Sequence, residues 1–212
     1  MKQVKITVEE MNDSIDKTIF SDLESCDPEE VVSRTGCRFD KIANQYFVNI
    51  WGHEYCVDLN RYEVQPKGTG IKTYQDFLYL FILYYLMQSK AIKPSGEWVS
   101  EKDIPSGAAF FRGPHTIPGN LITSRFGNDI DAFKKESKKL NGISLDMADA
   151  AFSFEITPAI PVAVLYFMGD EDFPSEAKLL FDKTIGLHLT LDIIFALAVE
   201  ICNTLGTTKD HQ

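Results

Sequence analysis

The chain has 212 residues, 44% of them hydrophobic and 12% aromatic, which supplies a core and excludes a disordered chain. Its formal net charge of −10 leaves no basic face for phosphates, so neither nucleic acid nor an anionic membrane surface is an expected partner. The longest apolar run, residues 77–87, is about half of the roughly twenty residues that a membrane-spanning helix needs. No membrane association is therefore expected.

The cysteines stand far apart, at positions 26, 37, 56 and 202, with no spacing typical of a zinc or iron–sulfur site. Scattered cysteines in a chain of this size predict reduced thiols. Residues 1–10 alternate polar and apolar and show no signal peptide. A cytoplasmic location is therefore expected.

The N-terminal segment, residues 1–26, is acidic and has two interpretations. It is either a solvated segment or an arm that docks a basic partner. Within it, Val4, Ile6 and Val8 alternate like a short strand. A helix is then predicted to begin at Asp27-Pro28, where Asp caps and Pro suits the first turn, and to end at Gly36.

The pattern changes to strands between residues 37 and 64. Residues 46–51 and 54–59 are rich in β-formers and flank Gly52-His53, which predicts a hairpin with a type II′ turn. Residues 38–42 are expected to pair before them, giving an antiparallel meander. Pro66, Gly68 and Gly70 then interrupt the pattern.

A helix over residues 73–90 is predicted to be the buried centre of the fold, because its middle is apolar on every face. Residues 94–119 are expected to be irregular, which is often a sign of function in a compact domain. Further elements follow from local pattern. These are short strands at 98–100 and 108–111, helices at 119–126 and 129–140, paired strands at 152–156 and 161–168, and a helix at 190–205. The order predicts one α+β domain over residues 1–212, with an antiparallel meander, a buried central helix and C-terminal helices.

Two groups of side chains could carry chemistry. Asp170, Glu171 and Asp172 follow a buried strand and could hold a divalent cation, although a solvated turn that caps a following helix is the simpler interpretation. His115 and His188 could ligate a metal or the metal of a cofactor, or could be packing histidines. No nucleophile elbow, phosphate-binding loop or dinucleotide fingerprint is present in the sequence.

The second half also carries a set of motifs that occur together in one family. They are residues 96–100 (GEWVS), 105–107 (PSG), 158–168, 169–174 (GDEDFP), 180–182 (LFD) and 188–192 (HLTLD). In them the chain resembles an uncharacterised domain family of anaerobic bacteria and archaea, sometimes labelled an iron–sulfur cluster protein. Some relatives carry a cysteine-rich cluster segment, which this chain lacks, so no iron–sulfur cluster is expected here.

The resemblance implies an accessory role in anaerobic corrinoid or redox metabolism. The leading prediction is a cofactor-binding or accessory protein that handles a corrinoid or another tetrapyrrole, with Trp98, His115 and His188 at the site. One alternative is an enzyme that uses a divalent cation at Asp170–Asp172. The other is a protein–protein interaction module that docks through residues 1–26. Phe173, Leu180 and Phe181 are expected to anchor the core.

Overall fold

The structure is a computed structural model that describes residues 16–68 and 76–207. It confirms an α+β fold with an antiparallel meander and C-terminal helices. The chain forms two compact units, Met1–Ala91 and Ile92–Gln212, each described here by itself. The division falls at residue 91, and not at the predicted break around Pro66. That the whole chain acts as one domain stays a prediction.

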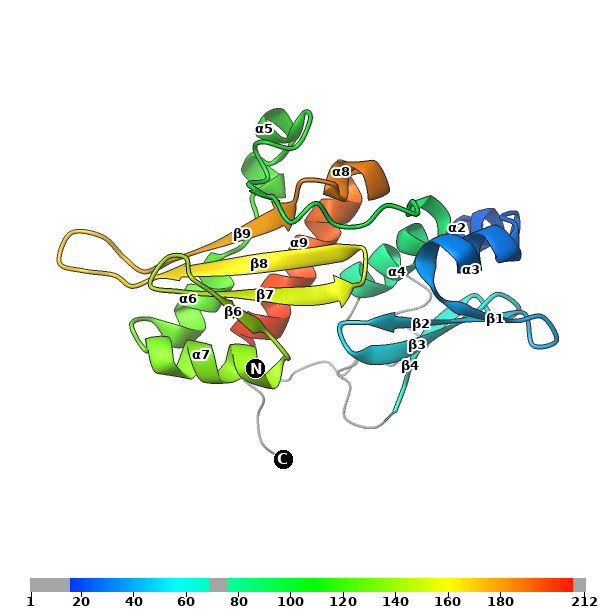
Figure 1. The fold of residues 1–212 in the computed structure, drawn as a ribbon, viewed down its shortest axis with the longest axis horizontal. Helices are drawn as coiled ribbons and strands as arrows, with labels where there is room; N and C mark the ends of the chain where they lie inside the picture. The colour runs from blue at the N-terminus through cyan, green and yellow to red at the C-terminus, as the bar shows by residue number, and fades with distance from the viewer. Residues whose placement is uncertain (1–15, 69–75, 208–212) are drawn as a thin grey trace. The chain divides into compact units, whose positions relative to one another are not determined.

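In the described residues, the first unit has three helices and a four-stranded antiparallel sheet of order β1-β2-β3-β4 (Figure 1). Its elements are α2 (Lys17–Glu24), α3 (Pro28–Thr35), β1 (Arg38–Asp40), β2 (Gln45–Ile50), β3 (His53–Asp58), β4 (Glu63–Lys67) and α4 (Asp76–Gln88). The predicted strand at residues 4–8 and the predicted start of the long helix at Thr73 lie outside the described residues.

The predicted caps of α3 are confirmed, but the predicted hairpin turn is wrong by one residue. The Asp27 carboxylate accepts the Glu29 N–H at 3.0 Å, and Gly36 closes α3. Ile50 pairs with His53, so the turn residues are Trp51 and Gly52. Both have positive φ, 50° and 76°, which is the type I′ geometry and not type II′.

The core of the first unit follows from strand alternation. In β2 the buried residues are Tyr46, Val48 and Ile50, while Asn49 between them is exposed. The middle of α4 is almost entirely buried, as predicted for the central helix. The Tyr85 hydroxyl donates to the Thr35 carbonyl at 3.2 Å, which ties α4 to the end of α3.

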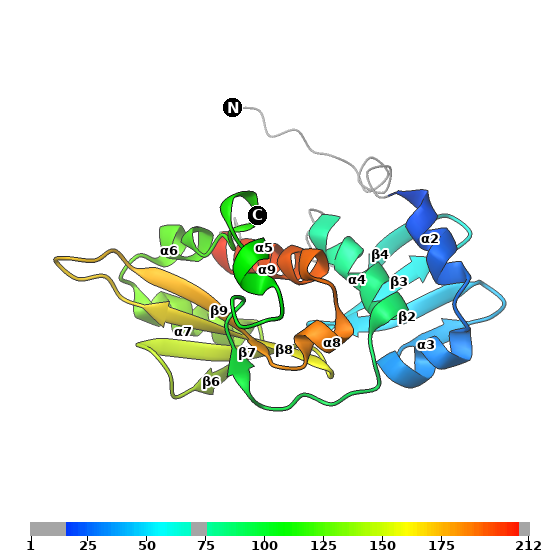
Figure 2. The same cartoon turned by 90° about the horizontal axis from the view of Figure 1, so that it is seen from above.

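The second unit contains a five-stranded antiparallel sheet of order β5-β9-β8-β7-β6 (Figures 1 and 2). Its strands are β5 (Trp98–Val99), β6 (Ile143–Leu145), β7 (Ala150–Thr157), β8 (Ile160–Phe167) and β9 (Glu176–Asp182). Its helices are α5 (Gly107–Phe110), the 3₁₀ turn η1 (Gly113–His115), α6 (Asn120–Phe126), α7 (Ile130–Lys139), α8 (Ile185–His188) and α9 (Leu191–Gly206).

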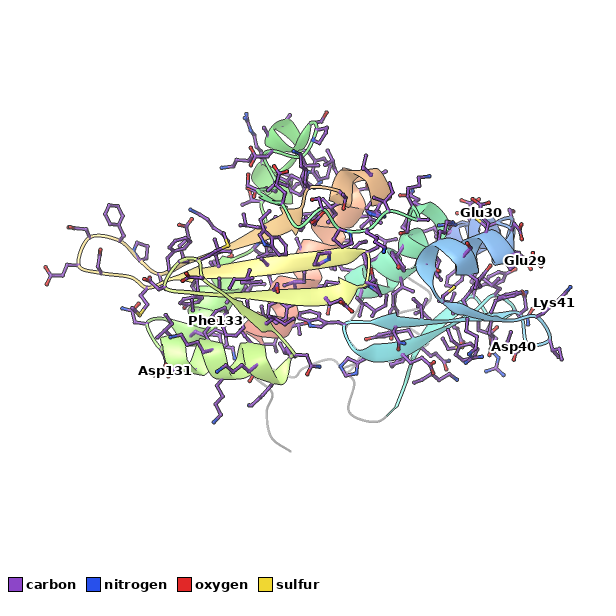
Figure 3. All side chains as sticks on the ribbon, viewed as in Figure 1. Glu29, Glu30, Asp40, Lys41, Asp131 and Phe133 are labelled. Atoms are coloured by element: carbon purple, nitrogen blue, oxygen red, sulfur yellow. The ribbon has the colours of Figure 1, made fainter. Side chains whose placement is uncertain are left out.

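Helices α6, α7 and α9 cover one face of this sheet (Figures 1 and 2). Phe133 of α7 is fully buried and points to the sheet, whereas Asp131 points away (Figure 3). The Phe133 ring stacks on Tyr166 of β8 with centroids 4.6 Å apart and meets Phe152 of β7 edge-on at 5.9 Å. Aromatic packing thus joins the helical layer to the central strands.

Three predictions about this unit are wrong. Residues 108–111 begin in the short helix α5, and are not a strand. The acidic turn is followed by the strand β9, and not by a helix that the acids cap. Phe173 is 71% exposed and anchors nothing, although Phe181 is fully buried as expected. The helices α6, α7 and α9 and the paired strands β7 and β8 are confirmed.

Candidate functional site

The edge strand β9 is covered by a neighbouring strand over only part of its length. β5 pairs with β9 at two positions, Trp98 with Asp182 and Val99 with Phe181. The chain then turns away through Ser100, whose N–H and hydroxyl both donate to the Asp103 carboxylate, at 3.1 and 2.6 Å. On the side away from β8, the rest of β9 therefore has no strand beside it.

The direction of the backbone groups along β9 follows from one hydrogen bond. The Lys183 N–H donates to the Glu97 carbonyl at 2.9 Å, so odd-numbered residues of β9 direct their N–H and C=O toward β5. The backbone N–H and C=O groups of Leu179 and Ala177 accordingly point to the side of β9 that β5 leaves uncovered. Within residues 16–68 and 76–207, no backbone hydrogen bond outside the ladders reaches Leu179.

Two glycines hold the neighbouring chain against this edge. A Cβ at Gly107 would overlap the carbonyl oxygen of Glu101, so only glycine lets α5 lie on the turn that follows β5. A Cβ at Gly119 would overlap the carbonyl oxygen of Ala177, so glycine also allows the start of α6 to touch β9. These contacts limit the open edge at Ala177 and shape the segment that faces it.

Between the open edge and the 100–117 segment lies a groove of about 720 Å³, within the range typical of ligand sites. We call it the β9-edge groove. Its lining residues are Ser100, Glu101, Lys102, Ala108, Phe111, Arg112, Gly113, Thr116, Ile117, Glu176, Ala177, Lys178, Leu179 and Leu180.

The charged residues of the β9-edge groove are not balanced. Lys178 pairs with Glu176 at 3.0 Å and lies 5.3 Å from the centre of the Phe167 ring. Lys102 and Arg112 are exposed, and neither forms an ion pair within the described residues. Glu101 also lines the groove and forms no ion pair within the described residues, so three cations (Lys102, Arg112, Lys178) against two anions (Glu101, Glu176) leave a net charge of +1 in a chain whose net charge is −10.

The buried carboxylate of Asp182 fixes the backbone of the residues that lead into β5. Asp182 accepts from the Ser95 N–H and the Gly96 N–H at 3.0 and 2.7 Å, and from the Thr184 hydroxyl at 2.7 Å. Burial raises the pKa of Asp182, but the hydrogen bonds from Ser95, Thr184 and Gly96 outweigh it and lower the pKa to about 2. This aspartate positions Trp98 beside β9, and its role is structural.

Trp98, predicted as a cofactor contact, lies on the face of the sheet that α6, α7 and α9 do not cover. It packs with Leu180 and other half-buried residues around Ala163 and Leu165. Leu180 also lines the β9-edge groove, so this apolar surface adjoins the groove. Trp98 itself is not among the lining residues.

The two predicted histidines have different surroundings. The half-buried His115 ring stacks on Phe110 at 4.4 Å and meets Phe195 edge-on at 5.4 Å. His188 is 1% exposed and ends α8. His115 lies between the groove residues Gly113 and Thr116 in sequence, but its ring packs against phenylalanines. A ligand role for either histidine stays a prediction.

The acidic turn is organised by its own backbone. One Asp170 carboxylate oxygen accepts the N–H groups of Asp172 and Phe173, at 2.9 and 2.8 Å. These hydrogen bonds lower the pKa of Asp170. Glu171 and Asp172 are exposed. Across the described part of the chain, no three His, Cys, Asp or Glu side chains gather to hold a metal ion, and the cation role of Asp170–Asp172 stays a prediction.

The sequence analysis did not identify the β9-edge groove, because it assigned no strand to residues 176–182. The alternation of Ala177, Leu179 and Phe181 with charged or partly exposed residues was the available signal. Lys102 and Arg112 carried no signal, since an isolated surface cation in a loop is common. No helix in the described residues is long and apolar enough to cross a membrane.

The chain belongs to a protein family described as "Domain of unknown function (DUF3786)", whose model matches residues 27–204. The match covers nearly all of the described part of both units. It confirms membership of a family without an assigned function. No curated protein and no solved structure matches the chain.

Proposed function

We propose that this DUF3786 protein is a binding module whose ligand site is the β9-edge groove, and that its ligand is a segment of a partner protein. The observation that carries the proposal is the early end of β5, which leaves Leu179 facing a groove of about 720 Å³. Unpaired strand edges are normally short, covered or charged, because they invite pairing with another chain. Here the edge at Leu179 has no strand on its outer side and lies in a groove lined by both apolar and charged side chains, although Leu179 itself is only 3% exposed.

Three carboxylates with lowered pKa values have local structural partners outside the groove. Hydrogen bonds from Ser100 lower the pKa of Asp103, and those from Asp172 and Phe173 lower that of Asp170. Asp182 is held in the same way. Each of these groups fixes a turn or a strand entry, and none lines the groove.

Photo-crosslinking in the native host tests the proposal. A benzophenone amino acid placed at Ala108 or Thr116, both exposed groove residues, should crosslink to the same segment of one protein. The matched control is Asn49, which is exposed on β2 of the first unit. The proposal fails if the groove positions give no protein crosslink, or only those that Asn49 also gives.

A second candidate is a role in handling a corrinoid or another tetrapyrrole for a redox enzyme. The apolar surface around Trp98 adjoins a groove with two available cations, which would suit a flat ring with carboxylate substituents. An anaerobic absorbance titration of the full chain with haem and with cobalamin tests it. A saturable shift that His115→Ala or His188→Ala abolishes supports this role, and a flat titration with both counts against it.

A further inference from the structure

We infer that the β9-edge groove binds its partner as an added β-strand, in an extended segment that alternates apolar residues with acidic ones. This inference rests on the proposed function and specifies the chemistry of the partner. Three features of the groove support it: its backbone groups, its apolar side chains and its charges.

The backbone groups favour an extended partner. By alternation along β9, the N–H and C=O of Leu179 face the side that β5 leaves uncovered, although the residue is only 3% exposed, and a residue of an antiparallel neighbour can bond to both groups at once. This pairing would continue the ladder that β5 begins at Val99 and Phe181. Main-chain bonds of this kind supply affinity when a peptide adds to a sheet edge.

The side chains of the groove predict alternation in the partner. Leu180 lies on the same face as Trp98, whereas Leu179 lies on the face that carries α6. Successive residues of an added strand would point to these two faces in turn. Ile117 and Phe111 line the groove beside the edge, so an apolar side chain opposite Leu179 would be enclosed.

The charges predict the polar positions. Lys102 and Arg112 line the groove and have no ion-pair partner within the described residues, whereas Lys178 is paired with Glu176. A partner carrying Asp or Glu would pair with these two cations, next to Glu101, the one unpaired anion of the groove lining within the described residues. Because both cations are exposed, this attraction should weaken as salt is added.

The test uses the full chain as bait for a displayed library of random short peptides. Enriched peptides are then measured by fluorescence polarisation against the wild type and two groove variants. Leu179→Pro removes an N–H that faces the groove and not the β8 ladder, but it also removes a core side chain that is 3% exposed, so circular dichroism checks its fold and the charge variant decides if it does not fold. The double variant Lys102→Glu/Arg112→Glu reverses the free charges, and Lys41→Glu/Lys135→Glu reverses two exposed lysines elsewhere as the matched control.

The inference predicts enriched peptides with alternating apolar and acidic residues. Their affinity should fall by about tenfold or more in both groove variants and stay unchanged in the control. Enrichment of peptides without this pattern, binding indifferent to both groove variants, or no enrichment would overturn it. Crosslinks from Ala108 and Thr116 to one partner would still uphold the proposed function in those cases, so the two failures are distinguishable.

Discussion

Replacing Asp182 by asparagine tests how the entry to β5 is held. The change keeps the size of the side chain but removes the negative charge to which five N–H and O–H groups of Ser95, Gly96 and Thr184 donate. The side chain is 2% exposed, so water cannot replace these bonds. The second unit of Asp182→Asn should therefore unfold more easily than that of the wild type.

The magnitude follows from the pKa. A fall from the ordinary 3.8 to about 2 is worth about 2 kcal/mol of stability for the ionised Asp182. Since the folded pKa is the lower one, this stability is present above pH 3.8 and is lost as the pH falls toward 2. The asparagine variant should show no such loss, so the two proteins should converge in acid.

Urea unfolding at several pH values, followed by Trp98 fluorescence in a Trp51→Phe background, measures this difference. Asp146→Asn, at an exposed position of the same unit, is the control and should change little. A destabilisation of Asp182→Asn below about 0.5 kcal/mol at neutral pH would refute the reasoning, as would an equal effect at neutral and acid pH.

Three further predictions concern packing and burial. Gly119→Ala should destabilise the protein by about 1–3 kcal/mol, because the new Cβ would overlap the Ala177 carbonyl oxygen. Gly186→Ala, whose Cβ would have its nearest neighbour at 3.4 Å, should be neutral or stabilising. Thermal unfolding of the two variants measures the difference, and equal effects would contradict the Gly119 contact. Tyr46→Phe should not lower stability in urea, because the buried Tyr46 hydroxyl has no hydrogen-bond partner among the described residues; a loss above about 1 kcal/mol would reveal one. Burial raises the pKa of the Cys202 thiol to about 12, so a thiol reagent should label it only after unfolding, and labelling in the native protein would contradict its burial.

Local signals predicted much of the fold. Asp27 and Gly36 bound α3 because capping is a property of a few neighbouring residues. The apolar run at 161–168 predicted a buried strand, and the structure has β8 at Ile160–Phe167, one residue earlier, with Met168 exposed. The hairpin turn was misplaced by one residue because Gly52 fits either turn type, and the register that selects Trp51-Gly52 depends on pairing along the whole of β2 and β3.

The candidate site could not be predicted in the same way. The β9-edge groove exists because β5 ends at Val99 while β9 continues to Glu176, and that mismatch joins residues about 80 positions apart. Nothing in the local sequence around Lys102 or Arg112 indicates a site. They become candidates only because the fold places both in the lining of the groove beside β9. The predicted histidines are chemically capable residues, but their packing depends on Phe110 and Phe195, which no local pattern connects to them.

The central claim, that β9 presents an open edge at Leu179, is tested most directly by amide hydrogen exchange measured residue by residue with NMR. The Leu179 N–H faces the groove, while the Leu180 N–H faces β8. We predict that the Leu179 amide of the free protein, which has no hydrogen-bond partner within the described residues, exchanges faster than the Leu180 amide although Leu179 is only 3% exposed. Equal protection of the two amides would contradict an open edge and the binding role that depends on it.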